Sequence, residues 1–218
     1  MIVKSMNSKE LTNEIAKDYP MVVRKAIYLT ESLRREAVKS KNKYVHRTYN
    51  YKSQRQNNWL IIVNYHVNDP LFNVVCHYID DHGLNGIMVG ADNKSLMHYT
   101  PHFLERYNER FLQQSNISKK ELLIRYVSNN AVGHAHISTD AMEMTDRTFI
   151  RTREGIGLGC LEKLDGIQNL YTHYKTFISN RMILSYQQET FNLTGQQYEK
   201  YWNETYSRTR IGAYELAS

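Results

Sequence analysis

The sequence predicts an α+β fold: an antiparallel sheet, built from a meander and a second block of strands, with helices packed on one side and helical additions at both ends. Two blocks rich in β-branched and aromatic residues, within 58–99 and 147–178, support this prediction. Neither block can bury both of its faces alone, so we expect their strands to pair with each other. The 218 residues divide into a basic helical arm and linker, 1–57, and an α+β domain with C-terminal helices, 58–218, which together form one structural unit.

The N-terminal arm predicts two helices. Asn7, followed three residues later by Glu10, has the pattern of a capping box, which marks a helix start. Pro20 interrupts the helical pattern, and Asp18 is placed to cap a second helix that ends near Lys41. Apolar residues recur on this second helix at spacings of three and four, as on a buried face: Val22, Ala26, Leu29, Leu33 and Ala37.

The first β-rich block predicts four strands, over 58–66, 71–79, 84–90 and 95–99. The short stretches between them contain Asp, Asn, Gly and Pro, which favour turns, so the strands should form an antiparallel meander. Two helices follow, from Pro101 to about Gln114 and from Ser118 to about Asn129. Ser118 and Glu121 have the spacing of a second capping box.

The second block predicts strands over 147–152, 155–163 and 169–178, and two helices, around 179–191 and 194–206, close the chain. Gly155, Gly157 and Gly159 alternate with apolar residues, so on a strand they leave one face bare. A bare face permits close approach of a helix, another backbone or a ligand, and we expect tight helix packing there. The order of elements excludes a dinucleotide-binding glycine loop, because no helix follows the glycines directly.

The last predicted strand, "YTHYKTFIS", is rich in polar residues. Strict alternation puts Thr172, Tyr174, Thr176 and Ile178 on one face, and His173, Lys175 and Phe177 on the other. A polar strand just before a helix can present a hydroxyl group, as from Thr176, or an amine, as from Lys175, to a cleft. We therefore keep Thr176 and Lys175 as candidate site residues.

The composition, 41% hydrophobic and 23% charged, is that of a folded globular protein. The two cysteines, Cys76 and Cys160, lie in apolar segments, which argues against a disulfide framework and for a reducing compartment. There is no signal-peptide pattern and no apolar stretch of 18 residues. We expect a cytoplasmic protein without a membrane partner, and we predict no cofactor and no metal.

The net charge of +6 is unevenly distributed, because residues 1–57 alone carry +8. The basic segment, residues 39–56, holds six Lys or Arg and three Tyr but no acidic residue. Basic residues interleaved with aromatic ones favour a phosphate backbone and unstacked bases. The sequence therefore predicts a nucleic-acid partner, RNA rather than DNA, bound in part by Lys41, Lys43, Arg47 and Lys52. The alternative is a solvated linker.

The stretch "TPHFLERYNERF" places His102, Arg106 and Arg110 at intervals of four, which forms one row on a helix. Thr100 and Pro101 suit the start of that helix, so His102 lies in its first turn. Free N–H groups and the positive end of the helix dipole favour a phosphate there. This cationic row either binds an anion or forms ordinary surface ion pairs with the neighbouring glutamates.

The same stretch, followed by a helix, a glycine-bearing hairpin and "YKTFIS", resembles the barnase–EndoU–colicin–RelE superfamily, above all its phage-associated branch. The resemblance covers about residues 58–185 and depends on a His-x-x-x-Arg helix and a Thr-bearing terminal strand. It implies a toxin-like, phage-associated or mobile-element-associated nuclease. Such enzymes cleave RNA without a metal, by activating a ribose 2′-hydroxyl against the neighbouring phosphate.

Carried over to this chain, the resemblance implies a role for four residues. His102 would be the acid or base, and Arg106 would neutralise the phosphate. Thr176 would position the phosphate, and Arg110 would extend the anion site.

Three alternatives stay open. His98-Tyr-Thr100 and His136-Ile-Ser138 each match the His-x-Thr/Ser triplet of the 2H phosphoesterases. His134 and His136 have the spacing of two metal ligands on one strand face, although a third ligand is not evident. A nucleic-acid-binding protein or phage accessory protein without catalytic activity would use the same basic segment and cationic row.

Overall fold

The computed structural model describes residues 1–66, 70–90, 95–130, 134–138, 146–164 and 170–183. The strands are β1 (Tyr44–Lys52), β2 (Asn58–His66), β3 (Leu71–Asp80), β4 (Gly83–Val89), β5 (Ser95–Tyr99), β6 (His134–Ser138), β7 (Asp146–Arg151), β8 (Gly155–Lys163) and β9 (Leu170–Ser179). The helices are α1 (Ser8–Ser40), α2 (Pro101–Tyr107) and α3 (Lys119–Asn130), with a π-helical turn η1 (Asn108–Leu112) and a 3₁₀ turn η2 (Asn180–Met182).

Within the described ranges, nine strands form one sheet in the order β1-β2-β3-β4-β5-β9-β8-β7-β6. Neighbouring strands are antiparallel except β5 and β9, which are parallel and join the two blocks. The predicted α+β class, the meander from β2 to β5 and the pairing of the two blocks are therefore confirmed. No helix in the described part of the chain has the length and apolar character needed to span a membrane.

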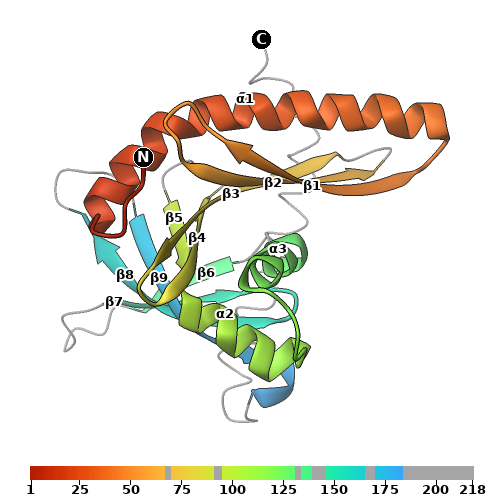
Figure 1. Cartoon of the computed structure of the whole chain (residues 1–218). Helices are drawn as coiled ribbons and strands as arrows, with labels where there is room; N and C mark the ends of the chain where they lie inside the picture. The colour runs from red at the N-terminus through yellow and green to blue at the C-terminus, as the bar shows by residue number, and fades with distance from the viewer. Residues whose placement is uncertain (67–69, 91–94, 131–133, 139–145, 165–169, 184–218) are drawn as a thin grey trace.

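The helices lie on both faces of the sheet, where the sequence led us to expect one (Figure 1). Strand β2 explains this arrangement, because its residues are buried toward both sides. Trp59 and Ile61 pack in the core under α1, whereas Leu60 and Ile62 pack in the core under α2 and α3. A strand at the centre of two cores requires apolar cover on each face.

Helix α1 is one continuous helix of 33 residues. The capping box of Asn7 and Glu10 is confirmed, but the predicted break before Pro20 is wrong. Pro20 lies inside the helix, where proline usually costs about 3 kcal/mol. Burial of apolar residues on both sides of it, such as Ile15 and Val22, offsets that cost and keeps the two halves in line.

The basic segment does not form the linker that was the alternative prediction. Residues 44–52 form β1, which pairs with β2 along its whole length and lies at the edge of the sheet. Val45, Tyr49 and Tyr51 pack against the core under α1. The sequence analysis did not predict this strand. Its other face carries polar residues and the strand lies at the sheet edge, only partly buried, so its sequence lacks the apolar pattern of a buried strand.

The two helices that follow β5 begin as predicted. Thr100 caps α2, since its Oγ1 accepts a hydrogen bond from the Phe103 N–H at 3.2 Å. Ser118 and Glu121 form the second capping box, with hydrogen bonds of 3.0 and 3.2 Å. The α-helical pattern ends at Tyr107, earlier than expected, and η1 continues the chain to Leu112.

The alternation predicted for the last strand is wrong beyond its middle. Strand β9 pairs Thr176 with Leu158 but Tyr174 with Gly159, so Lys175 is an extra residue, a β-bulge. The bulge brings Tyr174 and Phe177 into the same core, under α2 and α3. Of the predicted C-terminal helices, all residues from 184 onward lie outside the described residues.

The glycines of β8 meet two kinds of neighbour. A Cβ atom on Gly157 would lie 2.9 Å from Ile150 of β7 and 3.2 Å from Phe103 of α2, so the expected close helix packing is confirmed at this position, together with close packing of the neighbouring strand. At Gly155 and Gly159 the close neighbour is instead the backbone of β9, because added Cβ atoms would lie 2.2 and 2.1 Å from the carbonyl oxygens of Ile178 and His173.

A polar network fastens α1 to the turn between β1 and β2. Arg55 donates to both carboxylate oxygens of Glu14, at 3.1 and 2.6 Å. Asn57 and Trp59 donate to Asp18, at 2.9 and 2.8 Å. The hydrogen bonds from Arg55, with smaller contributions from the N-terminal ammonium group and Asn57, lower the pKa of Glu14 from 4.5 to about 2 against the opposing effect of burial. The ionised form of Glu14 therefore stabilises the fold.

We predict that Glu14→Gln reduces the acid sensitivity of the protein. Because the folded-state pKa of Glu14 lies below 4.5, its stabilisation is complete above that pH and is lost as the pH falls toward 2. The free energy of unfolding should drop by roughly 2–3 kcal/mol more in the wild type than in Glu14→Gln over this range. Urea denaturation at a series of pH values measures the difference. Glu31→Gln, which removes an exposed pair with Arg34, is the control, and equal curves for Glu14→Gln and wild type would contradict the prediction.

Candidate functional site

The cationic row lies on the exposed side of α2. The Nε2 atom of His102 accepts a hydrogen bond from Nε of Arg106 at 3.3 Å, and its Nδ1 lies 3.7 Å from a carboxylate oxygen of Glu105. Arg106 pairs with Glu109 at 2.6 Å. The structure thus brings His102 and Arg106 together and also provides the surface ion pairs of the alternative interpretation.

The side chain of Arg110 does not line up with those of His102 and Arg106, because the π-helical turn η1 has more residues per turn than α2. The N–H of Gln113 bonds to the carbonyl oxygen of Asn108 five residues earlier, which turns this segment toward β9. The guanidinium of Arg110 donates to Oγ1 of Thr176 at 3.3 Å and to the carbonyl oxygen of Phe177 at 2.8 Å. Arg110 and Thr176 are therefore in contact, while Lys175 is exposed at the bulge.

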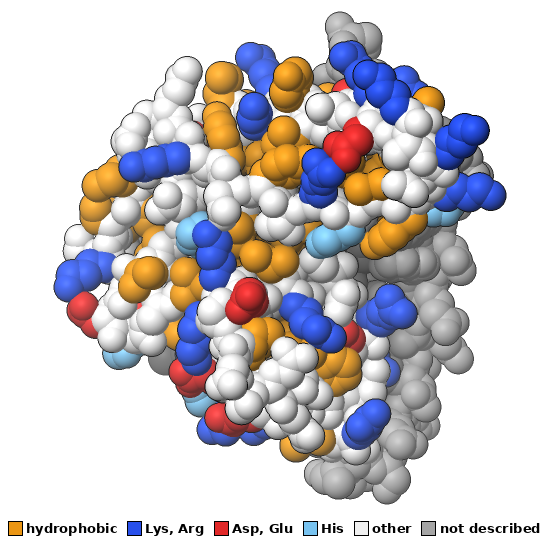
Figure 2. All heavy atoms as spheres, turned by 45° about the vertical axis from the view of Figure 1, so that its right-hand side comes forward, with side chains coloured by type: hydrophobic (Ala, Val, Ile, Leu, Met, Phe, Trp, Pro, Cys, Tyr) orange, Lys and Arg blue, Asp and Glu red, His pale blue; other side chains and the backbone are white. Residues whose placement is uncertain are grey.

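The basic segment is distant from these residues. Lys41 caps the C-terminus of α1 and Lys43 follows it, whereas Lys52 lies at the other end of β1, about 30 Å away along an extended strand. Arg47 pairs with Glu36 of α1. Figure 2 shows Lys and Arg side chains gathered over α1 and β1, with few acidic side chains among them. Four strands lie between β1 and β9 in the sheet, which puts these two strands about 24 Å apart. The basic surface over α1 and β1 is therefore separate from the residues around Thr176.

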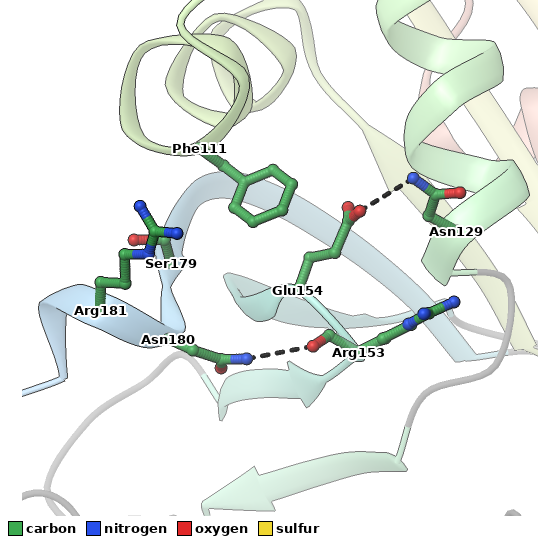
Figure 3. A pocket seen from close by; sticks show the side chains of 7 residues that line it. All are labelled: Phe111, Asn129, Arg153, Glu154, Ser179, Asn180 and Arg181. Carbon is green, nitrogen blue, oxygen red and sulfur yellow. Dashed lines mark hydrogen bonds between the residues drawn. The ribbon is translucent and has the colours of Figure 1, made fainter.

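A pocket of about 470 Å³ lies at the end of β9 (Figure 3). Five segments contribute to it: η1, the C-terminal end of α3, the turn between β7 and β8, the end of β9, and η2. Its lining consists of Phe111, Asn129, Arg153, Glu154, Ser179, Asn180 and Arg181. The volume falls within the range of about 300–1,000 Å³ that is usual for small-molecule sites.

The turn between β7 and β8 places two of the charged groups. The backbone N–H of Thr152 bonds to the carbonyl oxygen of Gly155 at 2.9 Å, which leaves Arg153 and Glu154 at the tip. Asn180 holds this tip against the end of β9, because its side chain donates to the Arg153 carbonyl oxygen at 3.0 Å. Its backbone N–H also donates to the carbonyl oxygen of Glu154, at 3.3 Å.

Three donors fix the carboxylate of Glu154. Asn129 donates to Oε1 at 2.8 Å, and the Tyr107 hydroxyl and Asn130 each donate to Oε2 at 2.6 Å. Burial, and then the hydrogen bond to Glu154, raises the pKa of Tyr107, so this hydroxyl remains a donor. A carboxylate offers about four lone-pair positions, and the described residues fill three. One position on Oε1 therefore has no donor among the described residues.

The remaining polar groups of the pocket are donors without acceptors. The hydroxyl of Ser179 has no hydrogen-bond partner among the described residues, although Ser179 is only 2% exposed. Neither the guanidinium of Arg153 nor that of Arg181 forms an ion pair within the part of the chain that the structure describes. Figure 3 shows Arg181 and Ser179 on one side of the pocket and Arg153 and Glu154 on the other. These donors favour an anion with several acceptor oxygens.

The histidines of the alternative motifs are placed differently. His98 is 6% exposed, and its ring bonds to Asn85 at 2.8 Å and to the Tyr171 hydroxyl at 3.1 Å. Burial lowers its pKa to about 3, so it is a neutral core residue. His134 and His136 lie on β6, but their side chains are outside the described part of the structure.

The sequence analysis missed the pocket residues Arg153, Glu154, Ser179 and Arg181. Their signal was their position: Arg153 and Glu154 form the turn before the glycine-bearing strand, and Ser179 ends the last strand. Polar residues at such strand ends meet when the strands are neighbours in the sheet. The neighbour relation of β8 and β9 was the missing information.

Comparisons with protein-family models, with curated proteins and with solved structures gave no match. The chemistry of the pocket therefore follows from its own geometry. Within the described ranges, no group of three or more His, Cys, Asp or Glu side chains is placed to hold a metal ion.

Proposed function

We propose that the protein binds nucleic acid, with backbone phosphates held by Arg153 and Arg181 on the two sides of the pocket. One observation carries this proposal: the guanidiniums of Arg153 and Arg181 lie on opposite sides of the pocket and form no ion pair among the described residues, and the buried hydroxyl of Ser179 has no hydrogen-bond partner among them. Phosphate oxygens, like those of carboxylates, accept paired hydrogen bonds from a guanidinium. The net charge of +6 attracts a polyanion to the surface around the pocket.

The charges of the pocket fit a diester phosphate. Two guanidiniums and the carboxylate of Glu154 give the lining a charge of about +1, which one phosphodiester neutralises. A terminal phosphate with two charges would be repelled more strongly by Glu154. The free lone-pair position on Oε1 of Glu154 suits a hydroxyl donor, which the ribose of RNA has and the sugar of DNA lacks. These features support RNA as the partner.

We predict that Arg153→Gln and Arg181→Gln each weaken the binding of a single-stranded RNA oligonucleotide by about 10-fold or more, because a hydrogen bond to a charged group is worth about 1.5–3 kcal/mol. The slope of log Kd against log salt concentration should fall by about 0.7 for each phosphate that the variant no longer binds. Fluorescence anisotropy at several salt concentrations measures both quantities. Lys4→Gln, at an exposed position that precedes α1 and pairs with Asp81, should leave affinity and slope nearly unchanged. Wild-type affinity in both pocket variants would refute the proposal.

The basic segment is a second contact surface for the same partner. Neutralising Lys41, Lys43, Arg47 and Lys52 together should weaken binding and flatten its salt dependence, because fewer counterions are released. Its effect should add to that of Arg153→Gln, since the two surfaces are separate. The same anisotropy series tests this. A salt slope equal to that of the wild type would show that β1 serves only as an edge strand.

RNA cleavage without a metal is a second candidate function, of the toxin-like or phage-associated kind. Its supporting observation is the hydrogen bond from Nε of Arg106 to Nε2 of His102, which places an imidazole directly beside a guanidinium. Contact between Arg110 and Thr176 adds a second cation to the same side of the domain. In this reaction His102 would take the proton of a ribose hydroxyl, and Arg106 would stabilise charge on the phosphate.

For this second candidate, we predict that His102→Ala lowers RNA cleavage in EDTA by about 10²–10⁴-fold with little change in binding. Arg106→Ala should lower both cleavage and binding. Arg106→Lys should restore only part of the lost activity, because the ammonium group of lysine cannot form the two parallel hydrogen bonds of a planar guanidinium. Labelled RNA, analysed for cyclic-phosphate ends, measures the reaction. His82→Ala, an exposed histidine between β3 and β4, is the control. Full cleavage activity in His102→Ala would contradict the cleavage function, and nucleic-acid binding would be the one function still proposed.

A further inference from the structure

We infer that the pocket selects an unpaired nucleotide, whose base stacks on the ring of Phe111 while its flanking phosphates lie toward Arg153 and Arg181. This inference rests on the proposed binding of nucleic acid. It adds a discrimination between single-stranded and double-stranded partners, which phosphate contacts alone do not provide.

Phe111 is an aromatic ring at the pocket with no polar function of its own. It is 37% exposed, whereas most large apolar side chains on the same side of the sheet are buried. Figure 3 shows the ring projecting from η1 over the pocket. The π-helical turn that directs Arg110 toward β9 also directs the next residue, Phe111, to this position.

The ring of Phe111 is held in place from behind. It stacks on Tyr107 with a centroid distance of 5.7 Å and an interplanar angle of 17°, and it meets the edge of Phe177 at 6.4 Å. Tyr107 is itself fully buried and fixed by its hydrogen bond to Glu154. Little conformational entropy is therefore lost when a third ring adds to the stack, which favours binding.

A nucleobase is the ring that fits the surrounding chemistry. The same pocket offers guanidinium donors for a phosphate and a carboxylate acceptor for a hydroxyl, the two groups that flank a base in a nucleotide. Aromatic side chains stack on bases of any sequence, because every base has a π-face. A base inside a duplex is already stacked and paired, so it must be extruded before it reaches Phe111.

The experiment compares one RNA sequence as a single strand and as a duplex, with wild-type protein, Phe111→Leu and Phe111→Tyr. The wild-type protein should bind the single strand more tightly than the duplex. Phe111→Leu should bind the single strand about 5-fold to 100-fold more weakly than the wild type, because one stacked base contributes about that much affinity. Phe111→Tyr keeps a ring and should keep the affinity. Tyr28→Leu, which removes an exposed aromatic ring on α1, is the matched control and should bind as the wild type does.

A wild-type measurement with RNA that carries abasic sites makes the test independent of any folding defect, and it should show the same loss as Phe111→Leu. Equal affinity of wild type for single strand and duplex, or for normal and abasic RNA, overturns the inference. If Arg153→Gln still weakens binding in that case, the proposed function stands without the stacking. If Arg153→Gln and Arg181→Gln are also without effect, the proposed function itself fails.

Discussion

The parallel pairing of β5 with β9 is the constraint on which the rest of the structure depends. Tyr99 and Tyr174 face each other across this pair, stacked at 5.6 Å and 17°, and both are almost fully buried. Phe103 of α2 and Tyr126 of α3 pack against Tyr99 at 5.3 and 5.0 Å. Aromatic pairs of this kind contribute about 0.5–1.5 kcal/mol each beyond the area they bury. The same rings thus join the two strand blocks and fix both helices on them.

Tyr107 connects this core to the pocket. Its ring contacts Tyr126 and Phe177 edge-on at 5.1 and 5.2 Å, while its hydroxyl leaves the apolar cluster and bonds to Glu154. Glu154 lies on the turn between β7 and β8, and its hydrogen bond from the buried Tyr107 ties the position of its carboxylate to the packing of the core. A site whose acceptor is held in this way loses little freedom when a ligand binds, which distinguishes it from the exposed pairs of His102 and Arg106.

Sequence reasoning succeeded where the signal is local. The caps at Asn7, Thr100 and Ser118, and the strands from β2 to β5, follow from spacings within a few residues. It failed where a distant partner decides the outcome: α1 continues through Pro20 because its apolar face meets β2. The donors that fix Glu154 lie 24 to 47 residues before it, so no spacing rule could assemble them.

The β-bulge in β9 shows why the cationic row and the pocket belong to one surface. An unbroken strand would turn Phe177 away from the core, but the extra residue returns it beside Tyr107 and Tyr126. Arg110 then reaches the carbonyl oxygen of Phe177, two residues before Ser179 in the pocket. The helix that carries the row therefore ends against the strand whose end lines the pocket.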